Sequence, residues 1–517
     1  MAKRRLRITV LDMVSKGPAK RAFQRVMNAN LASIMPQVVA TWCEELGHDV
    51  NYVCYTGFED LHTELETTCD VLFIGAFSRS AQAAYAISNL YRRSGAVTVL
   101  GGPHARCYPE DAVQYFDYVL GFTDKTLLDD VLRDASPHRR EGLSLSAARQ
   151  PMELPSLEQR WKFVTATLKK APFVKIVPMI GSMGCPYTCS FCIDSTVDYQ
   201  PLSFDGIRSD LRFLLGKVKN PVVGWHDPNF GVRFNDYMGA IEDVVPQGRM
   251  RFLAESSLSI LNEPHLQRMK RNGFSGILPG IESWYSLGNK SKTGKSVGID
   301  KVRQVADHVN MILRYIPYVQ TNFVLGLDCD HGEGPFELTK HFIDLAPGAY
   351  PAFSLLTCYG AAAPLNLDFQ RAGRVLPFPF HLLDSNHAMN VRPLNYSWEE
   401  FYARSEDLTR YAHSPARLLK RFVSNEGMAV RGMNFIRATS SNRAKYQRKI
   451  RTLLREDGQV QAFFAGKTVQ LPDFYRNRIK RQLGSLWDAL PEGALMHDPN
   501  AYLRREESAA RKLVAAQ

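Results

Sequence analysis

The chain has 517 residues, of which 45% are hydrophobic and 22% charged, and its formal net charge at pH 7 is +12. This length predicts roughly two to four domains, and the composition is that of a soluble globular protein. No apolar stretch reaches the roughly eighteen residues of a membrane-spanning helix, and the apolar run at 8–11 is too short for a signal peptide. We therefore expect a cytoplasmic protein with no transmembrane segment. The nine cysteines, an odd number in a large chain, do not suggest a disulfide framework.

The positive charge is concentrated in the last part of the chain. Residues 401–517 contain 22 Lys and Arg against 11 Asp and Glu, so the rest of the chain is close to neutral. A basic segment of this kind favours an acidic partner, an anionic membrane surface or an anionic substrate. The alternative is a solvated helical face.

Short apolar strands alternate with helices over the first 133 residues. The pattern predicts strands at 8–11, 49–53, 70–75, 97–100 and 118–121 and helices at 28–46, at 81–93 and from 127 onward. Alternation of this kind predicts a doubly wound parallel sheet, whose ligands bind outside the carboxyl ends of the strands. Residues 134–172 contain turn formers, and we expect a connector with one short amphipathic helix at 157–168 laid over the mouth of the next domain.

A second strand and helix alternation runs from 173 to 385. It predicts six strands, at 173–180, 222–225, 252–255, 276–283, 319–326 and 353–357. Residues 386–517 instead predict a helical, basic region with helices at 398–411, 416–422, 433–455 and 472–490. The fold class is therefore α/β followed by a helical region.

Three of the nine cysteines lie within eight residues. Cys185, Cys189 and Cys192 are spaced C-x3-C-x2-C, directly after the first strand of the second alternation. Three thiolates on one loop can hold three irons of a cubane cluster and leave the fourth iron open to a substrate. The alternatives are a zinc site, which prefers four protein ligands in two pairs, and a structural cysteine cluster.

This spacing, with the aromatic Phe191 before the last cysteine, resembles the radical S-adenosylmethionine (SAM) superfamily. In that family the open iron of a [4Fe-4S] cluster binds the amino and carboxylate groups of SAM. An electron from the cluster then cleaves SAM to methionine and a 5'-deoxyadenosyl radical. The six predicted strands match the partial (β/α)6 barrel of the family, and the resemblance covers roughly residues 5–400.

The resemblance implies contacts with SAM at three successive strand ends. An acidic residue and a nearby Asn after the second strand face the SAM amino group, polar groups at the third strand end reach the ribose, and the G-I-E-S turn supplies a further carboxylate. The matching residues are Asp227, Asn229, Glu255, Ser256, Gly280 and Glu282. Each also has a structural explanation, since Asp227 can cap a helix and Glu255 can pair with Arg251. The segment 358–365 has lost two of the prolines and the threonine of the family's P-x-P-G-T-P-L pattern, so no specific substrate contact is carried over from it.

The first domain resembles the Rossmann-like cobalamin-binding domain that precedes many radical SAM modules. Its first loop keeps the Asp and Gly of the pattern D-x-H-x-x-G but has Val14 in place of the histidine, so no protein side chain would ligate cobalt there. The resemblance implies that the corrin faces the residues Asp12, Gly17, Ser78, Gly101 and Gly102. A glycine pair lets backbone approach a bulky ligand closely. The alternatives are a simple turn and a domain that has lost the cofactor.

The resemblance predicts a radical SAM enzyme that methylates an unactivated carbon with the help of cobalamin. One alternative is a radical SAM enzyme that cyclises or rearranges its substrate without methyl transfer, and another is a non-catalytic iron–sulfur protein or membrane-associated scaffold. We expect a small-molecule or lipid substrate and an external electron donor of the flavodoxin or ferredoxin type. Basic residues beside aromatic ones at the C-terminal end favour peripheral contact with the inner membrane face over nucleic acid, because no nucleic-acid-binding fold accompanies them.

Overall fold

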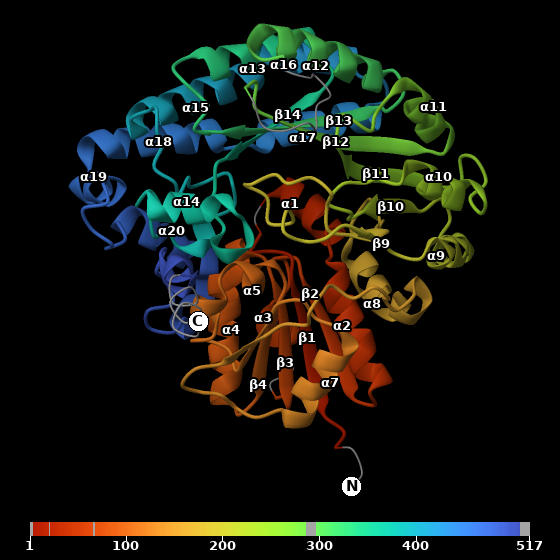
Figure 1. The fold of residues 1–517 in the computed structure, drawn as a ribbon, viewed down its shortest axis with the longest axis vertical. Coiled ribbons are helices and arrows are strands. Elements are labelled where there is room, and N and C mark those ends of the chain that lie inside the picture. Colours follow the sequence, from red (N-terminus) through yellow and green to blue (C-terminus); the bar gives the residue numbers. More distant parts are fainter. Residues whose placement is uncertain (1–3, 20, 66–67, 286–295, 507–517) are drawn as a thin grey trace, which may run out of the picture.

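A computed structural model describes residues 4–19, 21–65, 68–285 and 296–506 of the chain. It contains two six-stranded parallel sheets and a helical C-terminal region. Figure 1 shows the second sheet and its helices as an arch above the first sheet. No helix within these ranges is both long and apolar enough to cross a membrane.

The first sheet has the strand order β2-β1-β3-β4-β5-β6. Its strands are β1 (Arg7–Met13), β2 (Asp49–Tyr55), β3 (Val71–Ala76), β4 (Val97–Gly101), β5 (Tyr118–Leu120) and β6 (Leu143–Leu145). Alternate residues of β3 point to opposite faces, so Val71 and Phe73 join one core cluster while Leu72 and Ile74 join another. Both faces are covered, which explains why the central strands are apolar throughout.

Helices of the first domain pack on both faces of this sheet. One face meets α2 (Ile34–Glu45), α7 (Lys125–Asp134) and α8 (Leu157–Lys170), and the other meets α4 (Ala81–Arg93), α5 (Pro103–Cys107) and α6 (Pro109–Ala112). Shorter helices are α1 (Ala22–Met27), η1 (Asn28–Asn30), α3 (Leu61–Glu64) and η2 (Ser78–Ser80).

Three local features differ from the sequence expectations. The helix predicted at 28–46 begins at Ile34, because the Ser33 N–H is held by the Asp12 carboxylate and Pro36 fits the first helical turn. The strand β6 lies in the stretch predicted as a connector and extends the sheet beside β5. The amphipathic helix after it is present as α8, but it packs between α2 and α9 (Phe204–Lys217) rather than over a domain mouth.

The second sheet has the order β14-β13-β12-β11-β10-β7, with all neighbours parallel. Its strands are β7 (Ile176–Met179), β10 (Val222–Trp225), β11 (Arg251–Ser256), β12 (Phe274–Glu282), β13 (Tyr318–Leu325) and β14 (Tyr350–Leu355). All six lie where the sequence predicted strands. The two edge strands β7 and β14 do not pair with each other, so the sheet is open.

Helices cover one face of the second sheet and leave polar groups on the other. The covering helices are α9, α10 (Phe234–Glu242), α11 (Glu263–Arg271), α12 (Gly298–Leu313) and α13 (Gly334–Leu345) (Figure 1). On β13 the residues Val319 and Phe323 are buried, whereas Gln320 and Asn322 alternate with them and are only half-buried. This alternation gives the sheet an inner face that can accept polar ligands.

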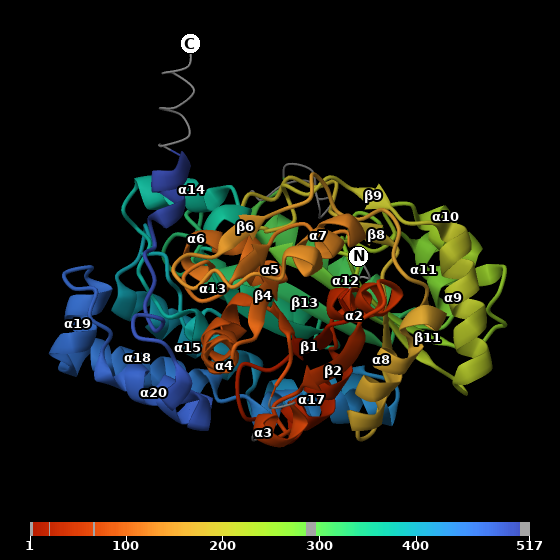
Figure 2. The ribbon, with the colours of Figure 1, turned by 90° about the horizontal axis from the view of Figure 1, so that it is seen from below.

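The C-terminal region lies against both sheets. It comprises α14 (Leu365–Arg371), α15 (Trp398–Ala412), α16 (Pro415–Ser424), α17 (Met428–Ser440), α18 (Arg443–Glu456), α19 (Gly458–Phe464), α20 (Asp473–Leu483) and the 3-10 turns η4 (Gly360–Ala362), η5 (Phe380–Leu382) and η6 (Gly484–Ala489). Figure 2 shows α17, α18 and α20 along one side of the molecule. The helix predicted at 433–455 is broken at Ser441–Asn442, since such residues bond to nearby backbone in competition with the helix.

Candidate active site

The carboxyl ends of the two sheets meet at one cavity of about 330 Å³. The first sheet contributes the ends of β3 and β4, and the second contributes Ile180 after β7 and His226 after β10. Strand ends are where parallel sheets bind ligands, because the loops and helix N-termini there offer free polar groups. The cavity is therefore the natural place for the chemistry of this fold.

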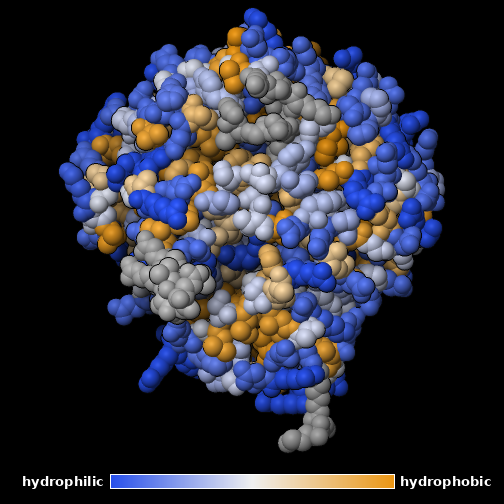
Figure 3. All heavy atoms as spheres, in the orientation of Figure 1, coloured by the Kyte–Doolittle hydropathy of each residue, from blue (hydrophilic) through white to orange (hydrophobic). Residues whose placement is uncertain are grey.

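The first-domain side of this cavity is apolar. Its walls are formed by side chains from β1, β3, β4, β5 and α2, namely Val10, Phe73, Val99, Leu120, Ile34 and Val39. Figure 3 shows hydrophobic residues gathered over these strands of the first sheet. Such a lining suits a bulky, largely apolar group rather than a free ion.

The glycine pair Gly101–Gly102 lines this cavity. No atom lies within 4 Å of the place where a Cβ on Gly101 would stand, so a side chain there would enter open space. Gly102 has φ +92, and a Cβ would approach the backbone of Ala76 at 3.0 Å. Because neither residue has a side chain, the pair leaves this side of the cavity open to a bulky group such as a corrin.

The cysteine loop borders the same cavity. It starts from a small hairpin of β8 (Ser182–Met183) and β9 (Gln200–Pro201), and Met183, Gly184 and Asp194 line the cavity. Gly184 has φ +68, and a Cβ there would collide with the carbonyl oxygens of Val197 and Asp198. Glycine is therefore required where the outgoing and returning arms of the loop cross.

None of the three cysteines of the loop forms a disulfide. Cys185 is buried, Cys189 and Cys192 are half-buried, and the Cys192 N–H donates to the Cys189 carbonyl at 2.9 Å. Within the part of the chain that the structure describes, no three His, Cys, Asp or Glu side chains are gathered as a metal-ion site. The donor set nevertheless fits an iron–sulfur cluster, since all three ligands are thiols on one loop and none is engaged in a disulfide.

Asp227 fastens the start of this loop. Its buried carboxylate accepts hydrogen bonds from the Gly181 N–H at 3.1 Å, from the Ser182 hydroxyl at 2.7 Å and from the Tyr237 hydroxyl. Burial raises the pKa of Asp227 against the effect of these donors. The carboxylate predicted to face the SAM amino group is thus already engaged with the protein.

The predicted residues after β10 and β11 form a second set of internal contacts. The Asn229 side chain accepts from the Ser257 N–H at 2.8 Å, and the Ser256 hydroxyl donates to the Phe230 carbonyl at 2.9 Å. Ser259 lies 2.7 Å from the hydroxyl of Tyr187, which belongs to the cysteine loop. The ends of these strands therefore support the loop directly.

The remaining predicted SAM contacts lie at the ends of two neighbouring strands, Glu255 in β11 and Gly280 and Glu282 in β12. Glu255 is exposed on the face of β11 opposite the buried Phe252 and Ala254. Glu282 is half-buried with φ +64, a conformation that costs a non-glycine residue of the order of 1 kcal/mol or more. Its carboxylate folds over Gly280, where a Cβ would collide with it. Strain of this kind is concentrated at functional sites.

Three predicted first-domain residues do not line the cavity. Asp12 accepts from the Ser33 N–H at 2.7 Å, and burial raises its pKa to about 7. Ser78 is buried beside His104, with its hydroxyl 3.3 Å from Nδ1, and Gly17 packs against the backbone of Gln482 in α20. Only Gly101 and Gly102 of the predicted set face the open space.

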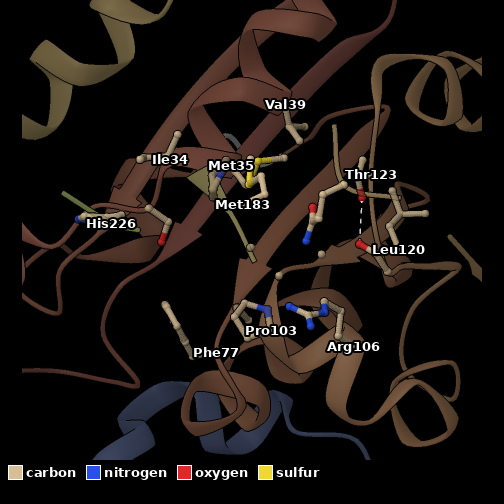
Figure 4. A pocket seen from close by; sticks show the side chains of 18 of the residues that line it. Ile34, Met35, Val39, Phe77, Pro103, Arg106, Leu120, Thr123, Met183 and His226 are labelled. Carbon is tan, nitrogen blue, oxygen red and sulfur yellow. Dashed lines mark hydrogen bonds between the residues drawn. The ribbon is translucent and has the colours of Figure 1, made fainter. Parts of the chain in front are cut away.

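Two cavity residues were missed by the sequence prediction. Arg106 of α5 donates to the Ile193 carbonyl at 2.8 Å and reaches Asp194 at 3.4 Å, so it joins the first domain to the end of the cysteine loop. His226 is exposed to the cavity, as Figure 4 shows. His226 could have been predicted as a cavity residue because it directly follows a predicted strand. Arg106 could not, because its contact with Ile193 joins residues 87 positions apart and leaves no local sequence pattern.

Residues from both domains surround this space. Figure 4 shows Pro103 and Arg106, both on α5, on one side of the cavity and Met35 and Met183 on the other. Met35 belongs to α2 of the first domain, whereas Met183 belongs to the hairpin that begins the cysteine loop. The cavity is therefore completed only when the two domains are together.

Comparison with known proteins found two methyltransferases of Chlorobaculum tepidum. The chain is 22% identical over 431 residues to bacteriochlorophyllide d C-12(1)-methyltransferase, which covers 82% of this chain and 89% of that protein. It is 23% identical over 399 residues to bacteriochlorophyllide d C-8(2)-methyltransferase, covering 71% of this chain and 85% of that protein. No family model matches the sequence.

Two solved enzymes share the fold. One is the radical SAM methyltransferase TsrM of Kitasatospora setae with cobalamin and a [4Fe-4S] cluster bound, at a TM-score of 0.52 and 14% identity over 76% of this chain and 79% of that one. The other is the cobalamin-dependent radical SAM enzyme OxsB with aqua-cobalamin bound, at a TM-score of 0.54 and 11% identity over 99% of this chain and 81% of that one. The α/β fold of this chain is thus shared with solved enzymes.

Proposed function

We propose that the chain is a radical SAM enzyme with a cobalamin-binding domain and that it methylates an unactivated carbon of a small-molecule or lipid substrate. One observation carries the proposal: a single cavity is lined both by Gly101–Gly102 of the first domain and by Met183, Gly184 and Asp194 around the cysteine loop. Two cofactors held at these places would face each other across it.

The cluster, SAM and cobalamin would supply the chemistry, and the protein would hold and position them. When bound, a [4Fe-4S] cluster with SAM supplies a 5'-deoxyadenosyl radical that takes a hydrogen atom from the substrate, and cobalamin supplies the methyl group. Cys185, Cys189 and Cys192 are the proposed cluster ligands. Asp227 holds the first residues of their loop, and Arg106 holds the segment that follows Cys192.

The proposal assigns SAM to the strand ends beside the loop. Glu255 and Glu282 offer carboxylates that can accept charge-assisted hydrogen bonds from an ammonium or a ribose hydroxyl. Asn229 and Ser256 fix the ends of β10 and β11 on either side. The apolar walls of the cavity exclude water from the space between the cofactors, which protects a reactive radical from side reactions.

Anaerobic reconstitution tests the cluster assignment. We expect about four irons per chain and SAM cleavage after reduction, and the substitution Cys185→Ala should abolish both. Cys358→Ala is the matched control, because Cys358 is a buried free thiol outside the loop. SAM cleavage by a variant that lacks all three loop cysteines would refute the proposal. A product without an added methylene would refute methyl transfer while leaving the radical chemistry in place.

Two further partners form part of the proposal. Reduction of the cluster requires an external one-electron donor of the flavodoxin or ferredoxin type. The C-terminal region presents exposed apolar side chains on α16 and α17, namely Leu419, Val423, Met428, Phe435 and Ile436. With Lys420 and Arg431 beside them in the sequence, they support peripheral contact with the anionic inner face of a membrane.

A further inference from the structure

A second cavity, of about 770 Å³, lies beside the carboxyl ends of β1 and β3 of the first sheet. The loop after β1 contributes Lys16, and the turn after β3 contributes Arg79. The loop 384–387 contributes His387, and this loop is tied to the end of β14 because the Leu355 N–H donates to the Ser385 carbonyl at 2.8 Å. The helix α20 closes the remaining side.

The lining of this second cavity is strongly basic. Five of the lining residues are Lys or Arg and one is acidic; the basic ones are Lys16, Arg21, Arg79, Arg478 and Arg481. The single acid, Asp384, is already neutralised, since it lies 2.6 Å from the Lys16 ammonium and 2.6 Å from Nδ1 of His387. The lining therefore contains no acidic side chain to balance the other four cations, Arg21, Arg79, Arg478 and Arg481.

Three of these cations have no acidic partner among the described residues. Arg79 donates only to the Val14 carbonyl, at 3.4 Å, and Arg481 only to the Asn477 carbonyl of its own helix, at 3.2 Å. Nε of Arg478 is buried without a hydrogen-bond partner in the described structure. Arg374, by contrast, makes a two-pronged contact with the Asp328 carboxylate. Uncompensated guanidinium groups in a cleft are suited to carboxylate or phosphate ligands.

The basic cavity adjoins the first one across a single turn. Phe77, which precedes η2, lines the first cavity, and Arg79 within η2 lines the second. Only Ser78 separates Arg79 of the second cavity from Phe77 of the first along the chain. This places an anion site next to the reaction site rather than on a remote surface.

We propose that this basic cavity, with Arg79 and Arg481 as its ion-pairing groups, binds a carboxylate or phosphate group of the substrate. The assignment to the substrate rests on the proposed function, whereas binding of the anion does not. The enzyme would thus act on an acidic molecule held by its charged end, with the reacting carbon extended into the first cavity.

Equilibrium dialysis with labelled inorganic phosphate and with labelled succinate, at low salt, tests the site on the full-length protein. We expect Arg79→Gln and Arg481→Gln each to weaken binding of at least one probe, and the double variant to weaken it about tenfold or more. The matched control is Arg476→Gln, an exposed arginine of the same helix that does not line the cavity. The preferred probe identifies the acidic group as phosphoryl or carboxyl.

The outcomes separate the two proposals. Equal affinity in the double variant and the Arg476→Gln control would overturn the anion site. Arg481 is exposed, so its single variant gives an answer even where Arg79→Gln disturbs folding, which circular dichroism would show. A chain that shows the expected loss of probe binding but never cleaves SAM would keep the anion site and overturn its assignment to a radical SAM substrate.

Discussion

At the scale of single residues, Asp227 is the best-connected side chain of the site. Its carboxylate accepts hydrogen bonds from Gly181 after β7, from Ser182 of β8 and from Tyr237 of α10. These three elements come together only in the folded state. A carboxylate in this position shapes the path of the backbone into the cysteine loop. Its contacts favour a positioning role over direct contact with SAM.

Replacing Asp227 by Asn tests this role. The amide can accept with one oxygen only, and its NH₂ group would face the hydroxyls of Ser182 or Tyr237. We expect the free energy of unfolding to fall by about 1–3 kcal/mol, measured by urea denaturation, together with a lower iron content after reconstitution.

Asp236→Asn is the control for this change. Asp236 pairs with Arg233 at the surface, and its loss should alter the free energy of unfolding by no more than about 0.5 kcal/mol. Unchanged stability and iron content in Asp227→Asn, with weaker SAM binding alone, would instead make Asp227 a direct ligand.

At the scale of elements, β4 determines the floor of the first cavity. The strand ends at Gly101, which pairs with Gly75 of β3, and the open space begins there. Glycine at the last position of β4 and at the second-last position of β3 leaves this edge of the sheet without side chains, so a bulky ring can approach its backbone.

Replacing Gly101 by Leu tests whether that space holds the corrin. The new side chain meets no protein atom within 4 Å of its Cβ, so the fold should lose no more than about 1 kcal/mol. The same side chain would occupy the cavity, and we expect protein from cobalamin-supplied cells to lose most of its corrin absorbance. Gly216→Leu, at an exposed and equally open position of α9, should leave the absorbance unchanged. Full corrin content in Gly101→Leu would place the cofactor elsewhere.

The same elements explain which parts of the fold were predictable. The strands of both sheets were, because their apolar runs and alternation are local signals. Gly101 and Gly102 were also found, since they directly follow a predicted strand. Asp12, Gly17 and Ser78 were expected to face a corrin because the domain resembles cobalamin-binding domains. Their surroundings in the structure depend on Ser33, on His104 and on a helix more than 450 residues away. Contacts at such a distance leave no local pattern.

At the scale of the whole molecule, charge and apolar surface are separated. The basic cavity lies between the strand ends of the first sheet and α20, whereas a group of exposed apolar side chains lies on α16 and α17 of the C-terminal region. Met428 is 72% exposed and Val423 69%.

Vesicle binding tests the membrane contact. We expect the protein to co-sediment with vesicles that contain anionic lipid and much less with zwitterionic ones. The double variant Val423→Asp and Met428→Asp should reduce this binding severalfold. Val469→Asp serves as the control, since Val469 is 74% exposed but lies outside α16 and α17. Equal sedimentation of all three proteins with anionic vesicles, or of none, would remove the membrane from the proposal.

The packing of η6 against α4 has a consequence for how the protein is made. The Asn89 side chain donates to the Ala489 carbonyl at 2.8 Å, a contact between residues 400 positions apart. The ribosome adds about 5–20 residues per second, so the face of α4 that η6 covers stays exposed for about 20–80 s before η6 emerges. During that time this face of the first domain is uncovered, and it is a surface to which a chaperone can bind.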